Sequence, residues 1–220
     1  MIGLLKKDFS YLAAYAKIYL AITAIMIVWF ITGNFGEPGL IGVVIIMIAV
    51  LMGSNTTAFD SQDGGMLFLM TLPVTSKMYA AEKYLLCLLM GIAGSCISLI
   101  VGFLRYREEL MQGELLSFLL ITFTYLACGM ILVALTLPIR LKFGSENAQL
   151  ITFAVVAGVV VLAYAGLYLL KALNIYAPEV AQSTTSASDI AVVTGIWVSA
   201  IVINAVSYLI SVHILNTREF

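Results

Sequence analysis

Few residues in this chain have a type and spacing suited to catalysis. The one histidine, His213, lies at the edge of a long apolar run, which is typical of a side chain at a membrane boundary. Glu108 and Glu109 form a carboxylate pair, but no histidine cluster follows them that could complete a hydrolytic site. The sequence therefore predicts no catalytic residue and no metal site.

Three further kinds of chemistry or binding are disfavoured. Cys87, Cys96 and Cys128 all fall inside apolar runs, where they predict helix packing rather than disulfides or a zinc site. No Gly-x-x-x-x-Gly-Lys-Ser/Thr loop occurs, so we expect no ATP to bind this chain through that motif. The formal net charge of −1 argues against nucleic acid, which requires clustered lysine and arginine.

The residues best suited to binding a partner lie between 60 and 83, where apolar side chains occur outside any long apolar run. Gly and Pro bracket a segment that predicts a short helix over about 61–72. Such a helix must be covered, either by the membrane surface or by a soluble partner. The candidate contact residues are Asp60, Asp63, Gly64, Met66, Phe68, Leu69, Pro73 and Lys77.

The composition indicates the kind of fold that must position these residues. Of 220 residues, 62% are hydrophobic and 10% are charged, which is too few charges for a water-facing surface. A membrane-spanning helix needs about 20 apolar residues. Six charge-free intervals reach that length: 18–36, 38–59, 84–104, 115–139, 147–170 and 190–212. Because lipid offers no partner for backbone polar groups, we expect one all-α transmembrane domain over 1–220, a polytopic membrane protein with six transmembrane helices.

The lysine and arginine distribution predicts the orientation. One side of the membrane receives both termini and the loops 60–83 and 140–146, and it holds eight of the 11 basic residues. The other side holds Arg105, Arg107 and Lys171. Basic residues favour the cytoplasmic side, so we expect both termini in the cytoplasm.

Residues 1–17 predict an amphipathic helix, with Lys7 and Lys17 on one face, Leu12 on the opposite face and Asp8 at the edge. This N-terminal helix either lies in the headgroup region as an interfacial helix or extends the first span. The sequence leaves both interpretations open.

The six predicted spans contain no Asp, Glu, Lys or Arg near their middle. Proton-coupled carriers usually place ionisable residues there, so transport through this chain is expected to be driven from outside it. The alternatives are a carrier that works without an ATPase, and an immunity or structural membrane protein. Neither an immunity nor a structural role explains the apolar segment at 61–72.

The two cytoplasmic loops together carry a family resemblance. The first has an acidic pair, a short helix, Leu72-Pro73-Val74 and Lys83-Tyr84-Leu85. The second resembles a Lys-Phe-Gly-x-Glu pattern at Lys142, Phe143, Gly144 and Glu146, and Arg140 precedes it in the same loop as a further candidate. Both resemble the membrane subunits of bacterial ABC exporters of the second exporter class, especially small permeases of Gram-positive bacteria. The second loop departs from the pattern at Asn147 and Gln149, where basic residues are common in that family.

The resemblance implies a permease subunit of the bacterial cytoplasmic membrane, with no ATP site of its own. Its partners would be a separate cytoplasmic ABC ATPase, which holds ATP and magnesium, and a second copy of this chain or a similar permease. The 61–72 segment would be the coupling helix, with Met66, Phe68 and Leu69 as its anchors. The implied substrates are amphipathic or hydrophobic molecules, with peptides favoured.

Overall fold

A computed structural model describes residues 2–32, 39–61, 65, 69, 74–105, 107, 115–172 and 187–217. Side chains are described for residues 3–28, 42–60, 65, 69, 74–105, 107, 115–143, 158 and 190–217. All regular elements in these ranges are α-helices, which confirms the predicted all-α class.

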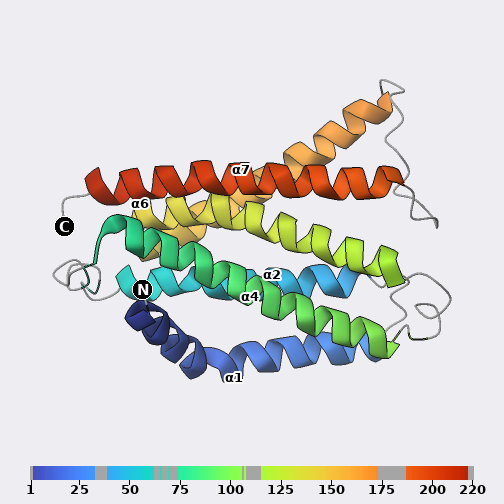
Figure 1. Ribbon diagram of the computed structural model, residues 1–220, viewed down its shortest axis with the longest axis horizontal. Coiled ribbons are helices and arrows are strands. Elements are labelled where there is room, and N and C mark those ends of the chain that lie inside the picture. Colours follow the sequence, from blue (N-terminus) through green and yellow to red (C-terminus); the bar gives the residue numbers. More distant parts are fainter. Residues whose placement is uncertain are drawn as a thin grey trace.

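Long helices build an elongated bundle (Figure 1). They are α1 (Ile2–Thr32), α2 (Gly39–Ser61), α4 (Ser76–Arg105), α6 (Leu115–Ala172) and α7 (Ala187–Thr217). The start of α1, the start of α4 and the end of α7 lie at the same end of the bundle, because Leu4, Tyr79 and Leu215 belong to one buried apolar cluster. We call this the basal end of the bundle.

The longest helix, α6, folds back on itself. A straight helix of its 58 residues would measure about 87 Å, far more than the roughly 30 Å hydrocarbon core of a bilayer. Figure 1 shows both ends of α6 at the end of the bundle opposite the basal end. Leu141 packs into the basal cluster, so the reversal lies near that residue. Pro138, which removes a helical hydrogen bond, precedes it and permits a bend.

Five helices in the described ranges are long and apolar enough to cross a membrane. They run over Gly3–Val28, Gly42–Asp60, Ser76–Arg105, Leu115–Phe143 and Ile190–Thr217, matching five of the six predicted spans. The sixth, 147–170, is helical in the returning part of α6, but all its side chains except position 158 lie outside the described ranges. Six spans and cytoplasmic termini therefore stay predictions.

Three local expectations can be compared with the backbone. Residues 140–146, expected as a loop, are helical, because α6 reverses by bending instead of breaking. Residues 2–17 are continuous with the first span in α1. Within the predicted 61–72 helix, only 61, 65 and 69 are described, and all three are helical.

The centre of the bundle is the close contact between α2 and α4. A Cβ placed on Gly94 would lie 2.8 Å from the Ala49 Cβ and 3.2 Å from the Ile46 Cα. One placed on Gly53 would lie 3.1 Å from the Cys87 Cα. Small residues let helix backbones approach closely, which is how helices in lipid gain packing energy.

We therefore expect Gly94→Val to lower the thermal unfolding temperature in detergent, because overpacking costs about 1–3 kcal/mol. Gly195→Val is the matched control, since a Cβ at Gly195 in α7 meets nothing within 4 Å. Equal unfolding temperatures for the two variants would contradict the close α2–α4 contact.

Candidate functional site

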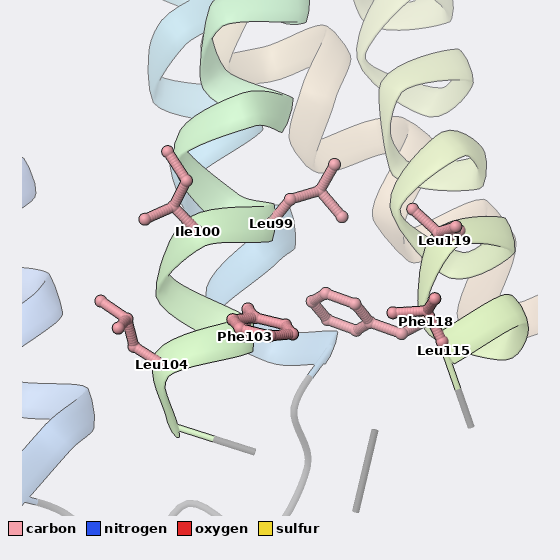
Figure 2. A pocket seen from close by; sticks show the side chains of 7 residues that line it. All are labelled: Leu99, Ile100, Phe103, Leu104, Leu115, Phe118 and Leu119. Atoms are coloured by element: carbon pink, nitrogen blue, oxygen red, sulfur yellow. The ribbon is translucent and has the colours of Figure 1, made fainter. Parts of the chain in front are cut away.

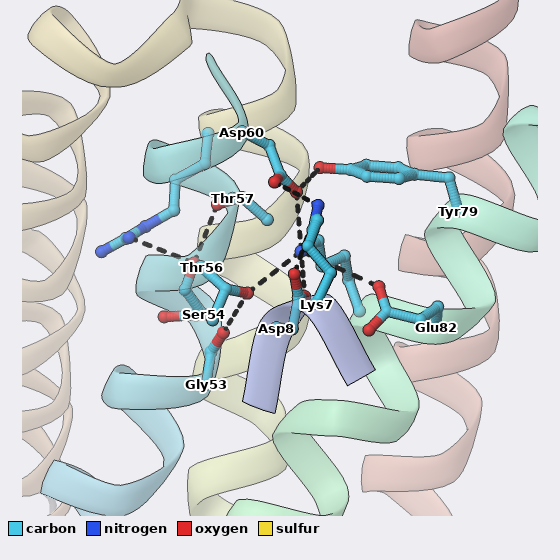
Figure 3. Close-up of polar contacts among 11 residues, drawn as sticks. Lys7, Asp8, Gly53, Ser54, Thr56, Thr57, Asp60, Tyr79 and Glu82 are labelled. Carbon is cyan, nitrogen blue, oxygen red and sulfur yellow. Dashed lines mark hydrogen bonds and ion pairs between the residues drawn. The ribbon is translucent and has the colours of Figure 1, made fainter. Parts of the chain in front are cut away.

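Charged side chains from α1, α2 and α4 converge inside the basal end of the bundle (Figure 3). Figure 3 shows Lys7 and Asp8 entering from α1, Asp60 from α2, and Glu82 from α4. Lys83 of α4 lies between them. The side chains of Asp8, Asp60, Glu82 and Lys83 are all 2% exposed or less. We call Lys7, Asp8, Asp60, Glu82 and Lys83 the basal charge cluster.

Local sequence explains how each helix delivers its side chain. Leu4, Asp8 and Leu12 are buried at intervals of four residues, so Asp8 lies on the stripe of α1 that packs against the bundle. The backbone N–H of Met78 donates to Oγ1 of Thr75 at 3.3 Å, an N-cap that sets the start of α4. That start places Lys83 within the second turn of α4, still near the basal end.

Lys83 is the centre of the cluster. Its Nζ forms an ion pair with Asp8, lies 2.7 Å from Oδ2 of Asp60, and donates to Oγ1 of Thr56 at 3.2 Å. Lys7 Nζ lies 2.5 Å from Oδ1 of Asp60. Two ammonium groups thus share the Asp60 carboxylate, and a buried charge needs such partners to offset its desolvation.

Tyr79 links the two ends of the segment that joins α2 to α4. Its hydroxyl donates to Oδ2 of Asp60 at 2.8 Å, and its ring centroid lies 5.3 Å from Lys83 Nζ, a cation–π distance. Tyr79 is fully buried. The chain between Asp60 and Tyr79 is therefore closed by a hydrogen bond at its base.

A second polar contact connects α6 to this end. The half-buried Arg140 donates from Nη1 to Oδ1 of Asn55 at 2.5 Å and to the Ser54 carbonyl at 3.2 Å. Nδ2 of Asn55 in turn donates to the Tyr19 hydroxyl at 3.2 Å. These hydrogen bonds tie α6 to α2, and α2 to α1.

The predicted contact residues fall into separate environments. Asp60 is buried in the basal charge cluster, and Leu69 is buried with Leu4, Leu141 and Leu215. Lys77 is exposed. The remaining residues of the predicted 60–83 set lie outside the described ranges: Asp63, Gly64, Met66, Phe68 and Pro73.

In the second predicted set, Arg140 faces the bundle whereas Lys142 and Phe143 are exposed. Lys142 Nζ lies 5.4 Å from the Phe143 ring centroid. The backbone at Gly144 and Glu146 is helical, and their surroundings lie outside the described side chains.

Sequence reasoning missed Asp8, Tyr79, Glu82 and Lys83 as one unit. The available signal was the four-residue spacing of Leu4, Asp8 and Leu12, which places a carboxylate on an apolar stripe where an unpaired charge is costly. No set of three or more His, Cys, Asp or Glu among the described residues could hold a metal ion. The ion pairs of the cluster join α1, α2 and α4, so the cluster is suited to holding these helices together.

Far from this cluster, a groove of about 330 Å³ opens between the end of α4 and the start of α6 (Figure 2). Its lining is entirely apolar, and Phe118 faces Phe103 across it. The lining residues are Leu99, Ile100, Phe103, Leu104, Leu115, Phe118 and Leu119. A groove with no polar group suits hydrocarbon.

Comparison with known protein families gives a match over nearly the whole chain. The family model described as ABC-2 family transporter protein matches residues 3–216. The chain therefore belongs to the ABC-2 family, as a multi-pass membrane component of a transporter. No individual curated protein matches the sequence.

Membership confirms the predicted permease subunit in its broad form. Permeases of this family lack ATPase motifs, and ATP binds to a partner ABC ATPase in the transporter complex.

We expect Lys83→Met to destabilise the bundle by about 3–5 kcal/mol, because it leaves buried carboxylates without their counter-charge. The measurement is the free energy of unfolding in detergent. Lys77→Met, at an exposed lysine of the same helix, is the control and should change it little. A Lys83→Met protein as stable as the control would show that the cluster does not hold the helices.

Proposed function

We propose that this chain is the transmembrane subunit of an ATP-driven exporter in the bacterial cytoplasmic membrane. A separate cytoplasmic ATPase would hydrolyse ATP, and the permease would move an amphipathic or hydrophobic substrate outward. The observation that carries this proposal is the family match over residues 3–216.

In this proposal the segment over 61–72 is the coupling helix. Support comes from its attachment: Asp60 and Tyr79 are hydrogen-bonded at its base, and Leu69 is buried against the bundle. A force on the segment would therefore reach α1, α2 and α4. Met66 and Phe68 would be the anchors that face the ATPase, since Met and aromatic side chains are enriched in interface cores.

The residues around these anchors take supporting roles in the proposal. Asp63 and the exposed Lys77 would form a polar rim, while Pro73 would fix the exit toward α4. Because Asp60 and Leu69 are buried, they would hold the segment on the bundle.

A second permease subunit would complete the translocation path, because six predicted spans are too few for a two-fold pathway. A further copy of this chain or a similar permease would serve. Exposed apolar side chains support this: Ile18 and Ile25 on α1 and Val198, Ile201 and Leu209 on α7 are each at least 59% exposed. Such faces are covered by lipid or by another membrane subunit.

For the substrate we propose amphipathic peptides. The cytoplasmic loops resemble those of the phenol-soluble-modulin exporter permease of Gram-positive bacteria. The sequence between 84 and 104 and between 115 and 139 holds no charged residue. A path built from such helices suits apolar surface, and charged groups would have to stay paired or hydrated.

Phe68→Asp should weaken co-purification of the ATPase, because a charge would replace an apolar anchor. We expect the wild-type permease in nanodiscs to retain a nucleotide-binding subunit from the same cell, and the variant to retain less by about tenfold or more, equivalent to about 1.4 kcal/mol. Leu69 is left unchanged because a charge there would disrupt the basal cluster.

Phe9→Asp is the matched control, since Phe9 is 47% exposed on α1 near the same end of the bundle. It should retain the ATPase. If Phe68→Asp also retains it, the coupling-helix assignment is wrong. If the wild type retains no nucleotide-binding subunit, ATP-driven transport by this pairing is wrong.

A further inference from the structure

The basal charge cluster contains more carboxyl groups than cations. Asp8, Asp60 and Glu82 contribute three carboxyl groups, and Lys7 and Lys83 contribute two ammonium groups. If all five were ionised, the buried site would carry a net charge of −1. An uncompensated charge in a low-dielectric interior is costly, and such a group usually takes up a proton instead.

The hydrogen-bond pattern identifies where a proton is missing. Asp60 accepts from Lys7 and Tyr79 and is ion-paired with Lys83, so both its oxygens are occupied. Both side-chain oxygens of Glu82, by contrast, are buried and accept no hydrogen bond from the described residues. The nearest cation, Lys83 Nζ, lies 3.8 Å from Oε2 of Glu82, beyond hydrogen-bonding distance.

Asp8 also has a buried oxygen that lacks a hydrogen-bond donor. Its Oδ2 pairs with Lys83, whereas its buried Oδ1 accepts no hydrogen bond from the described residues, with Lys7 Nζ 3.3 Å away. The carboxyl groups of Glu82 and Asp8 lie beside the same ammonium group, because Lys83 Nζ is ion-paired with Asp8 and lies 3.8 Å from Oε2 of Glu82. Two ionised carboxylates cannot hydrogen-bond, but a carboxylic acid donates to a carboxylate through a short, strong bond.

We propose that the basal charge cluster is a proton-binding site, in which protonated Glu82 donates a hydrogen bond to Oδ1 of Asp8. One proton gives both residues a hydrogen-bond partner and brings the cluster to two cations against two carboxylates. The inference does not depend on the proposed ATPase coupling.

The charged groups of the adjoining helices have other partners or face outward, so the proton is what neutralises Glu82. Lys7 and Lys83 are committed to Asp8 and Asp60, and Tyr79 donates to Asp60. Arg140 of α6 is bound to α2, and His213 of α7 is exposed. Because α1 supplies Asp8 and α4 supplies Glu82, the proton joins the two helices. Separating α1 would hydrate Glu82 and release the proton to water.

The test compares the pH dependence of thermal unfolding for the full-length wild type and Glu82→Gln in nanodiscs. The amide is neutral and can donate to Asp8 as the acid does. The folded wild type binds one proton more than the unfolded chain above about pH 4–5, so its stability falls as pH rises. Relative to Glu82→Gln, its unfolding temperature should drop by about 3 °C for each pH unit.

Glu109→Gln, between the predicted spans 84–104 and 115–139, is the matched control and should follow the wild type. Parallel profiles for wild type and Glu82→Gln would overturn the proposal. So would a wild type that gains stability relative to Glu82→Gln as pH rises, because that result is expected of an ionised Glu82 paired with Lys83.

A second measurement needs only the wild type, in case Glu82→Gln does not fold. Infrared spectroscopy with isotope-labelled glutamate should show the carbonyl stretch of a protonated carboxylic acid that persists at neutral pH. If all labelled glutamates are ionised at that pH, the shared proton does not exist. If the variant folds, loss of this band in Glu82→Gln assigns it to that residue.

Discussion

The ammonium group of Lys83 has to be neutralised inside an apolar bundle, and most of the architecture at the basal end follows from that requirement. The Lys83 side chain is 1% exposed, so its charge can be kept only where carboxylates lie against it. Asp8 comes from α1 and Asp60 from α2, and neither is close to Lys83 in sequence. Because the buried Lys83 charge needs both carboxylates, the ion pairs fix α1, α2 and α4 relative to one another. Apolar packing alone would let these helices slide.

Within the described ranges, the ion pairs that join helices lie in the basal charge cluster. Above the cluster, α2 and α4 meet through glycines, and their contact depends on shape and dispersion. The outer faces of α1 and α7 are apolar and largely exposed, which suits lipid or a neighbouring subunit. The molecule thus combines a basal end held by ion pairs with predicted spans that contain no charged residue. That division suits a permease, whose helices must rearrange while remaining connected to the part that receives the force.

The connection between α2 and α4 shows how such a force would be received. Its two ends are held by the Tyr79–Asp60 hydrogen bond, and Asp60 is itself shared between Lys7 and Lys83. A displacement of this connection therefore acts on the same carboxylate that holds α1. The proposed proton on Glu82 belongs to the same group of side chains, so the charge state of the site and the attachment of α1 are linked by one set of contacts.

The sequence by itself determined the class of protein. Charge-free intervals of about 20 residues require helices in lipid, and the described ranges contain five such helices. The motifs at 60–85 and 140–146 resemble those of ABC exporter permeases, and the match over residues 3–216 places the chain in the ABC-2 family. Sequence could not pair Asp8 with Lys83, or show that Asp60 and Leu69 face inward, because these contacts join residues far apart in the chain. Periodicity gives the faces of each helix, but only the packing of α1 against α2 and α4 decides which face is buried. The reversal of α6 was likewise decided by packing, since Pro138 permits a bend without setting its direction.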